Sequence, residues 1–239
     1  MDLHHIDNGV ISILIPFNDL QTKRVLEDDL EMYPIFEKYI DPDKNILDIG
    51  ACVGTMSVFF SKKTSKFVHA FEPMKDNFRL LQRNCIARKN IILHNFAIGN
   101  ENAQDITYNI HEQEGNVGMA QFYQAGINDS LDKMIPHLLN EKKIDTTKIK
   151  IKSIDNLPFD MVDCGFIKLD VEGFELPALI GAKEFIKEHQ PNIFIEIHSW
   201  DINNIEHNYK SEIFNLFHEL NYKVDYTFKN EEEFIFIPK

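Results

Sequence analysis

Four acidic side chains and one histidine stand at or near the ends of short apolar segments, where they could bind a ligand or transfer a proton. Asp48, Glu72 and Asp170 close three such segments, and Glu196 and His198 lie two residues apart in a fourth. Ligands bind beyond the carboxyl ends of the strands in an open parallel sheet, so we expect these side chains at one edge. Because carboxylates are costly to bury alone, the set predicts a ligand with hydrogen-bond donors or positive charge.

The segment GACVG, from Gly50 to Gly54, follows the first apolar segment and opens a helix. Its spacing is GxxxG, which differs from the GxGxxG of dinucleotide pyrophosphate sites and lacks the lysine of a P-loop. Glu72 closes the next apolar segment, the usual place for an acid that binds a ribose diol. These features favour a cofactor with an adenosine but no pyrophosphate, and S-adenosylmethionine is such a molecule.

The elements that must position these residues alternate between strands and amphipathic helices. Strands are predicted at 45–50, 66–72, 90–98, 163–170 and 192–198, and helices at 55–63, 75–88, from Leu176 onward and around 213–220. This alternation is typical of a parallel sheet with helices on both faces. Two further strands, 222–228 and 232–238, are too close in sequence for a crossover helix and are predicted to form an antiparallel hairpin.

We expect one domain over residues 1–239, with two additions to the alternating pattern. Residues 1–44 form an N-terminal extension, predicted as a strand over 10–17 and a helix over 30–40 with Pro34 in its first turn. Residues 99–148 are polar and form a predicted insertion on the substrate side of the sheet, followed by an extra strand at 149–155.

Composition limits the partners. Lys and Arg number 25 against 38 Asp and Glu, so the net charge of −13 disfavours duplex nucleic acid and anionic membranes. The three cysteines, Cys52, Cys85 and Cys164, lack CxxC spacing and fit a reducing compartment. The first residues lack the pattern of a signal peptide, and no apolar run is long enough to span a membrane, so we expect a cytoplasmic protein.

Five consecutive blocks resemble the motifs of the FkbM family of S-adenosylmethionine-dependent methyltransferases. They are ILDIGACVGTMSVFF, FEPMKDNFRLLQRN, NFAIG, FIKLDVEGFELPALIGA and PNIFIEIH, and they lie between Asn45 and His198. The resemblance implies a class I methyltransferase fold, a Rossmann-like seven-stranded sheet whose last strand is antiparallel. It also implies O-methylation of a sugar, a polysaccharide or another small hydroxylated molecule.

By this resemblance, Asp48, Gly50 and Gly54 hold the methionine part of the cofactor, and Glu72 binds the ribose hydroxyls. The remaining expected contacts are Ala51 and Pro73 beside those residues, Phe96 and Ala97 against the adenine, and Asp170, Glu172 and Gly173 near the methyl group and substrate. Two positions depart from the family pattern: Cys52 stands where asparagine is more frequent, and Lys75 where proline often occurs. Neither replaces a carboxylate.

The acceptor oxygen must be aligned with the sulfonium methyl and must lose its proton. His198 or Asp170 is the preferred general base, with Glu196 as a third candidate on the face of His198. In a second interpretation, a divalent cation such as Mg²⁺ is bound by Asp170, Glu196 and His198, with Glu172. In a third, His198 is a structural histidine that forms a hydrogen bond at the end of its strand. Lys168 shares a face with Asp170 and is expected to pair with it, and Trp200 either stacks on a sugar or packs in the core.

Three other functions remain open at this point. A nicotinamide-dependent oxidoreductase would use a related sheet, but the GxxxG spacing and the terminal hairpin disfavour it. A methyltransferase fold that has lost catalysis and serves as a binding module would not need Asp48, Glu72, Asp170 and Glu172. N-methylation is the third, since the sequence does not identify the acceptor atom.

Overall fold

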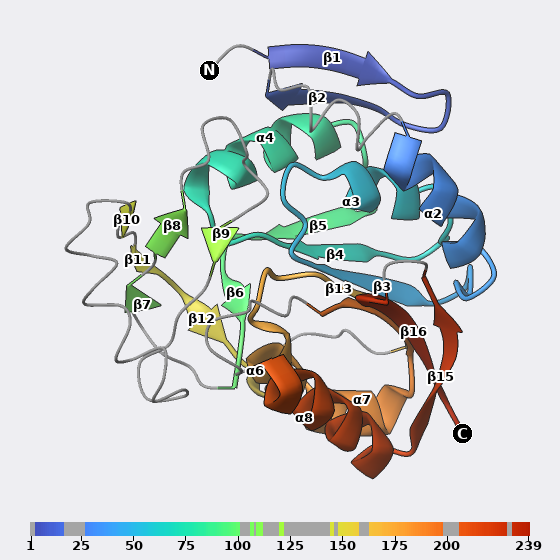
Figure 1. Cartoon of the computed structure of the whole chain (residues 1–239). Coiled ribbons are helices and arrows are strands. Elements are labelled where there is room, and N and C mark those ends of the chain that lie inside the picture. Colours follow the sequence, from blue (N-terminus) through green and yellow to red (C-terminus); the bar gives the residue numbers. More distant parts are fainter. Residues whose placement is uncertain are drawn as a thin grey trace.

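The structure is a computed structural model with a central sheet between two layers of helices (Figure 1). It describes residues 3–16, 27–100, 106–107, 109–111, 120–121, 144–145, 148–157, 163–197, 206–228 and 231–239. No helix within these ranges is long and apolar enough to cross a membrane.

Seven strands form the central sheet, in the order β15-β16-β14-β13-β3-β4-β5. Their bounds are β3 (Asn45–Ile49), β4 (Val68–Phe71), β5 (Ile91–His94), β13 (Cys164–Leu169), β14 (Asn192–Glu196), β15 (Tyr222–Thr227) and β16 (Glu233–Pro238). The run from β5 to β14 is parallel, and β16 lies antiparallel between β14 and β15. The predicted hairpin and its position at the end of a parallel sheet are confirmed.

The chain reverses its direction of winding at β3 and β13. From β3 it proceeds through β4 to the edge strand β5, and it then returns to the other side of β3 as β13. Such a switch point opens a crevice beyond the carboxyl ends of the two neighbouring strands. The topology thus puts the ends of β3 and β13, and the acidic residues near them, beside the crevice.

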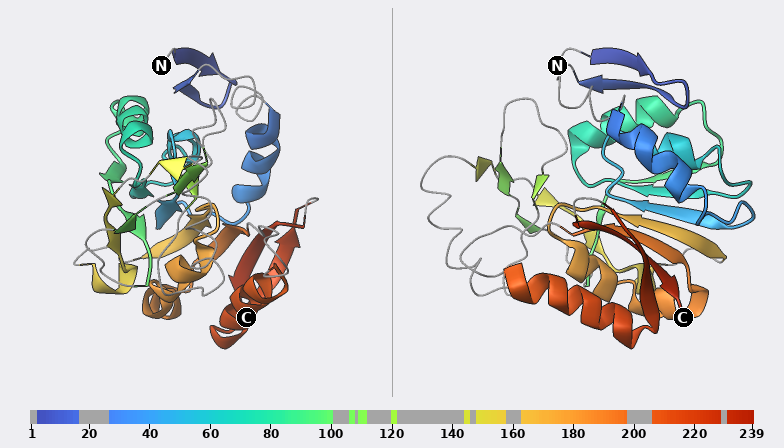
Figure 2. Two further views of the ribbon diagram at one scale, coloured as in Figure 1. Left: turned by 60° about the vertical axis from the view of Figure 1, so that its left-hand side comes forward. Right: turned by 45° about the vertical axis from the view of Figure 1, so that its right-hand side comes forward.

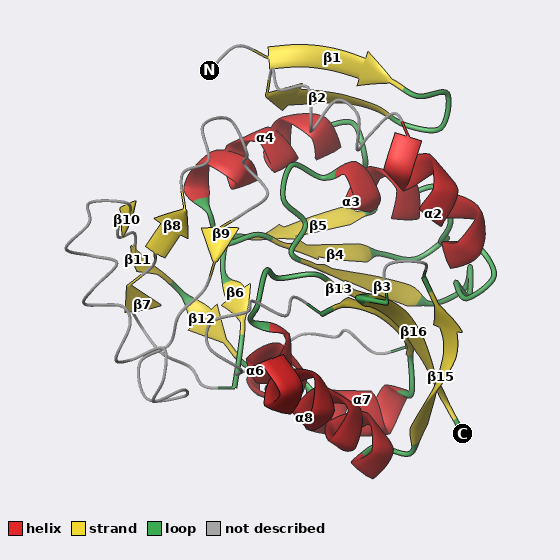
Figure 3. Ribbon diagram, viewed as in Figure 1, coloured by secondary structure: helices red, strands yellow, loops and turns green. Residues whose placement is uncertain are grey.

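Helices cover both faces of the sheet, as predicted (Figures 1, 2 and 3). One face carries α2 (Asp29–Phe36), α3 (Thr55–Phe60) and α4 (Lys75–Cys85). The other carries α6 (Glu175–Ile180), α7 (Lys183–His189) and α8 (Glu206–Glu219), with the short 3-10 helix η2 (Ile154–Asn156) beside α7.

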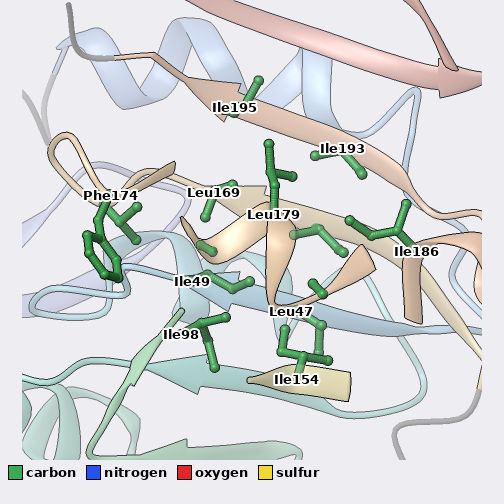
Figure 4. Close-up of a cluster of buried hydrophobic side chains, with 14 of the residues drawn as sticks. Leu47, Ile49, Ile98, Ile154, Leu169, Phe174, Leu179, Ile186, Ile193 and Ile195 are labelled. Carbon is green, nitrogen blue, oxygen red and sulfur yellow. The ribbon is translucent and has the colours of Figure 1, made fainter. Parts of the chain in front are cut away.

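The core divides into two clusters, one on each side of the sheet, because successive strand residues point to opposite faces. In β13, Phe166 packs into the cluster under α2, α3 and α4, whereas Ile167 and Leu169 join the cluster under α6 and α7. Figure 4 shows the latter cluster, where Leu169, Ile195 and Leu179 meet. All residues of β3 and β13 are buried, so these central strands form a firm support for the groups at their ends.

The N-terminal extension begins with a hairpin of β1 (Leu3–Asp7) and β2 (Ser12–Pro16), which precedes α2. It confirms the predicted strand at 10–17 within the described residues and adds a partner strand that the sequence did not predict. Asn84 of α4 attaches the hairpin to the domain, since its side chain accepts from the Leu14 N–H at 2.7 Å and donates to the Leu14 carbonyl at 2.8 Å.

The predicted helix over 30–40 requires correction. The observed α2 begins at Asp29 and ends at Phe36, and Pro34 lies inside it rather than in its first turn. Proline lacks the N–H that would bond one turn back, which weakens the helix. Burial of Tyr33 and Phe36 holds the helix despite this loss, and it ends soon after the proline.

The predicted third strand, 90–98, is also wrong as a single element. It divides into β5 and a separate β6 (Ala97–Ile98), which pairs in parallel with β12 (Ile151–Lys152) outside the central sheet. The break occurs at Asn95, whose side-chain amide donates to the carbonyls of Glu72 at 2.9 Å and Pro73 at 3.1 Å. Asn95 thereby ties the chain leaving β5 to the end of β4.

The predicted insertion contains short strands. They are β7 (Ile106–Thr107), β8 (Asn109–His111), β9 (Ala120–Gln121), β10 (Ile144–Asp145) and β11 (Lys148–Ile149). β8 lies between β10 and β9, and β11 pairs with β7, all antiparallel. Most of residues 99–148 lie outside the described residues, and the predicted strand at 149–155 corresponds to β11, β12 and η2.

Two buried histidines make the stability of this fold depend on pH. His69 of β4 and His94 of β5 are 3.1 Å apart between Nδ1 and Nε2, and burial lowers the pKa of each from 6.5 to about 4. Between these values the unfolded chain binds more protons than the folded one. The free energy of unfolding should therefore fall as the pH drops from 6.5 towards 4, by up to about 1.4 kcal/mol per pH unit for each histidine.

Urea unfolding at several pH values measures this slope. We expect His69→Gln to flatten it, whatever the variant does to stability at neutral pH, and His218→Gln, at an exposed position of α8, to leave it unchanged. An equal slope in the wild type and His69→Gln would contradict the prediction.

Candidate functional site

A cavity opens at the switch point, beyond the carboxyl ends of β3 and β13. Its wall is formed by Asp29, the loop 49–53, Thr55, Met56, Phe71, Glu72, Pro73, Asn77, Ala97, Ile98, Lys168, 170–172 and Phe174. Six of the predicted cofactor residues are brought together here: Gly50, Ala51, Glu72, Pro73, Ala97 and Asp170. The wall also includes Glu172 from the predicted substrate-side block.

The loop after β3 needs its first and last glycines for different reasons. Gly50 has φ of +85°, and a Cβ there would lie 1.7 Å from the carbonyl oxygen of Asp170, so the close approach of the two backbones requires glycine. Gly54 has φ of +96°, and a Cβ there would lie 2.7 Å from Cδ1 of Leu81 in α4. Gly54 is absent from the described cavity wall, so its place in the structure is the close packing of α3 on α4.

Asp48 lies beneath this loop and is fully buried. It accepts a hydrogen bond from the hydroxyl of Ser57 in α3, and its Oδ1 lies 3.8 Å from Nζ of Lys168. Burial raises the pKa of Asp48, and the charge of Lys168 and the Ser57 hydrogen bond counteract that rise. Asp48 is not among the described residues that line the cavity, and it faces the wall residue Lys168.

Lys168 connects the loop after β3 with the loop after β13. Its side chain is nearly buried, and Nζ lies 2.9 Å from Oδ2 of Asp170 and donates to the carbonyl of Gly50 at 2.8 Å. The predicted pairing of Lys168 with Asp170 is thus observed, and one ammonium also compensates part of the charge of Asp48. This arrangement fixes the position of the Asp170 carboxylate on the cavity wall.

Glu72 forms the wall at the end of β4. Its Oε2 accepts from the N–H of Cys52 at 2.9 Å, and its Oε1 accepts from the N–H of Met74 at 2.7 Å. Burial raises the pKa of Glu72 to about 8, although both backbone donors and Lys168 favour the ionised form. Burial therefore favours the protonated form of this carboxyl group, and a ligand that donates hydrogen bonds to it would favour the ionised form.

The predicted adenine contacts separate in the structure. Ala97 lines the cavity together with Ile98 and Phe71, which gives that side an apolar surface. Phe96 does not belong to the described wall and packs in the core instead, with its ring centroid 5.6 Å from that of Phe71 and Nζ of Lys152 4.5 Å above it. The side chain of Phe96 supports the apolar wall from behind.

The turn after β13 is held by residues that the sequence analysis missed. Glu172 and Gly173 have φ of +53° and +96°, and the buried Glu175 accepts from the N–H of Gly173 at 2.8 Å. The hydroxyl of Tyr209, in α8, lies 3.0 Å from Oε2 of Glu175 and accepts from the N–H of Leu176 at 3.1 Å. No local pattern marks Tyr209, because its partners are more than 30 positions away in the sequence.

The other predicted catalytic residues are not assembled in this cavity by the described part of the chain. Glu196 ends β14, opposite Glu233 of β16, and is not among the described residues of the wall. His198 and Trp200 lie outside the described residues. Within the described ranges, no three His, Cys, Asp or Glu side chains are arranged to hold a metal ion.

Asp29 and Asn77 are wall residues that the sequence analysis did not include. Asp29 is 1% exposed and is contributed by α2, well before the first cofactor motif. An acidic residue in the first turn of a helix is ordinary, since it favours the helix dipole, so the sequence offers no reason to select it.

The sheet order, with β16 antiparallel and the cavity at the switch point, defines a class I methyltransferase fold. A family model described as the Methyltransferase FkbM domain matches residues 48–224, and the chain belongs to this family. The structure and this match favour the methyltransferase prediction over the oxidoreductase alternative. None of the curated proteins compared with the sequence matches it.

Solved structures show the same fold at low sequence identity. The methyltransferase FkbM from Methylobacillus flagellatus KT is 18% identical with a TM-score of 0.50, and the similarity covers 92% of this chain but 55% of that one. This chain thus spans about half the length of that protein.

Two other solved structures are more distant. A protein from Streptococcus mutans, provisionally assigned as a methyltransferase and solved in complex with SAH, is 12% identical, with 87% and 94% coverage and a TM-score of 0.45. An rRNA methylase from Streptococcus thermophilus is 11% identical, with 87% and 95% coverage and a TM-score of 0.45. Both are too distant to support a conclusion about this chain.

The buried lysine gives a prediction about stability. Lys168→Met leaves Asp48 and Asp170 without their common cation, and such a loss from a buried ion pair costs about 3–5 kcal/mol. Chemical unfolding of the wild type and the variant measures the difference. Lys183→Met is the matched control, because its ion pair with Glu219 is solvent-exposed and should contribute less than about 1 kcal/mol. Equal effects of the two substitutions would refute the role given to Lys168.

Proposed function

We propose that this chain is an S-adenosylmethionine-dependent methyltransferase that methylates a hydroxyl oxygen of a carbohydrate or another small acceptor. The observation that carries the cofactor assignment is Glu72, a buried carboxyl group on the cavity wall beside the glycine loop. A buried acid in this place suits the two hydroxyls of a ribose. Membership of the FkbM family supports the same chemistry.

The residues present fit this cofactor. Glu72 would bind the ribose, Ala97 and Ile98 with Phe71 would contact the adenine, and the loop 50–53 would lie along the methionine part. The buried Oδ1 of Asp48 accepts no hydrogen bond from the described groups and lies 3.8 Å from Nζ of Lys168. This oxygen could therefore accept one more hydrogen bond. The sulfonium supplies an activated methyl group, and the chain must orient the acceptor and receive its proton.

Hydroxyl groups are the acceptors that this wall favours. The described wall carries the carboxyl groups of Asp29, Glu72, Asp170 and Glu172 and the single ammonium of Lys168. Carboxylates accept hydrogen bonds from hydroxyls and repel phosphates, so a neutral, hydroxyl-rich molecule suits the site better than a phosphorylated one or a nucleic acid. The predicted insertion, 99–148, is our candidate for the segment that selects the acceptor.

We assign the general base to His198 rather than to Asp170. The carboxylate of Asp170 is already engaged in an ion pair with Lys168, at 2.9 Å between Oδ2 and Nζ. Asp170 would therefore orient the acceptor hydroxyl, and His198, which follows β14 by two residues, would take its proton. The metal alternative with Mg²⁺ predicts instead that chelation abolishes methyl transfer.

Calorimetric titration with S-adenosylhomocysteine tests the cofactor assignment. We expect saturable binding by the wild type and a dissociation constant about 10- to 100-fold higher for Glu72→Gln, because hydrogen bonds to a charged group are lost. Asp76→Asn serves as the control, since Asp76 is an exposed acid in the first turn of α4. Absence of binding by the wild type would refute the proposal and favour the degenerate binding module.

The raised pKa of Glu72 predicts that binding releases protons. The free carboxyl group has a pKa of about 8, and ribose hydroxyls that donate to it would stabilise the ionised form and lower this pKa. Affinity should therefore rise as the pH increases towards 8, and protons should be released at pH 7. Calorimetric titrations in two buffers of different ionisation enthalpy measure the number of protons released on ligand binding. This number should fall to zero in Glu72→Gln. The same proton number in both proteins would contradict this role.

Once a methyl acceptor is found, the acceptor atom and the base can be tested together. A screen of sugars, amines and RNA with radiolabelled S-adenosylmethionine distinguishes O-methylation from N-methylation and from nucleic-acid methylation. Loss of the acidic limb of the pH–rate profile, the rise in rate as the base loses its proton, in His198→Ala but not in Asp170→Asn would support the assignment of the base.

A further inference from the structure

Asp29 occupies a position on the cavity wall that no motif of the chain accounts for. It is the first residue of α2, it is 1% exposed, and it shares the wall with the glycine loop and with Thr55 and Met56 of α3. Its position lies outside residues 48–224, the part of the chain that the family model matches. A carboxyl group from the N-terminal extension therefore completes a cavity built otherwise by the methyltransferase motifs.

The packing of α2 fixes this carboxyl group in place. Tyr33, one turn after Asp29, stacks on Phe59 of α3 with ring centroids 4.1 Å apart and planes inclined by 13°. Phe36, at the end of α2, contacts Phe194 of the sheet edge-on at 4.9 Å. Burial raises the pKa of Tyr33 above its ordinary range, and the negative charge of Asp29 raises it further. The carboxyl group of Asp29 therefore lies close to the Tyr33 side chain.

The charges of the wall indicate which kind of ligand group Asp29 suits. Among the described wall residues, Lys168 is the single cation against four carboxyl groups. Its ammonium is directed to Asp170 at 2.9 Å and to the Gly50 carbonyl at 2.8 Å. A ligand that brings its own positive charge is therefore electrostatically complementary to the wall, and an ammonium forms a charge-assisted hydrogen bond with a carboxylate.

We propose that Asp29 binds the α-ammonium group of the methionine part of the cofactor, an inference that rests on the proposed function. If the ribose lies at Glu72, the methionine part would lie along the loop 50–53, and Asp29 belongs to the same cavity wall as this loop and as Thr55 and Met56. That part carries one primary ammonium, which the adenosine part lacks. The N-terminal extension thereby contributes a direct cofactor contact and recognises the amino-acid end.

The test compares two ligands that differ in this end. S-adenosylhomocysteine contains the amino acid, whereas 5′-methylthioadenosine keeps the adenosine and the thioether without it. We expect Asp29→Asn to raise the dissociation constant for S-adenosylhomocysteine at least 10-fold and to leave that for 5′-methylthioadenosine within twofold. Asp28→Asn is the matched control, because Asp28 precedes Asp29 and is exposed. It should change neither constant.

Three outcomes would overturn the assignment. Equally weaker binding of both ligands would show a structural role for Asp29, and unchanged binding of both would show no role. Weaker binding of S-adenosylmethionine alone would place Asp29 at the sulfonium instead of the ammonium.

If Asp29→Asn fails to fold, Asp29→Glu replaces it as the test variant, because it keeps the charge but displaces it. This variant should weaken the binding of S-adenosylhomocysteine and leave that of 5′-methylthioadenosine unchanged. Wild-type protein that binds neither ligand would refute the proposed function itself, which is a distinct result.

Discussion

The described part of the cavity depends on the buried cation Lys168 at the switch point of the sheet. Lys168 lies within reach of Asp48, Asp170 and the Gly50 carbonyl, so one ammonium joins β3, β13 and the loops that follow them. Without Lys168, the carboxyl groups of Asp48 and Asp170 would be buried without a compensating positive charge, which would strongly destabilise the folded state. The ion cluster therefore makes the acidic cavity compatible with a stable core.

The same cation divides the carboxyl groups into two kinds. Asp170 forms a direct ion pair with Lys168, whereas burial raises the pKa of Glu72 to about 8. One acid is thus paired directly with a cation, whereas burial favours the protonated form of the other. This difference in environment, rather than in residue type, determines what each group can do.

Close backbone approach is the second constraint on the site. Gly50 meets the Asp170 carbonyl, and the turn at Glu172 and Gly173 is held from below by Glu175 and Tyr209. These contacts bring together the glycine loop, the turn after β13 and the distant helix α8. The described cavity wall consequently combines the backbone of the glycine loop with apolar side chains and with the carboxyl groups of Asp29, Glu72, Asp170 and Glu172.

The sequence alone determined the features that depend on local periodicity and on residue type. Strand and helix alternation, the terminal hairpin, the glycine loop and the acids at the strand ends are encoded within short segments, and most of the fold and six of the residues that line the cavity were predictable from them. Pro34 and Asn95 misled the prediction, since packing of Tyr33 and Phe36 and a side-chain hydrogen bond to another strand outweighed local preference.

Only the tertiary structure decided the depth and direction of individual side chains. Asp48 and Phe96 lie behind the wall rather than on it, and Asp29 and Tyr209 reach the site region from helices that no motif connects with it. Their partners are distant in the sequence, so their roles follow from how the helices pack on the sheet. A sequence pattern records which groups are present, whereas their burial and their charged neighbours arise from packing between elements.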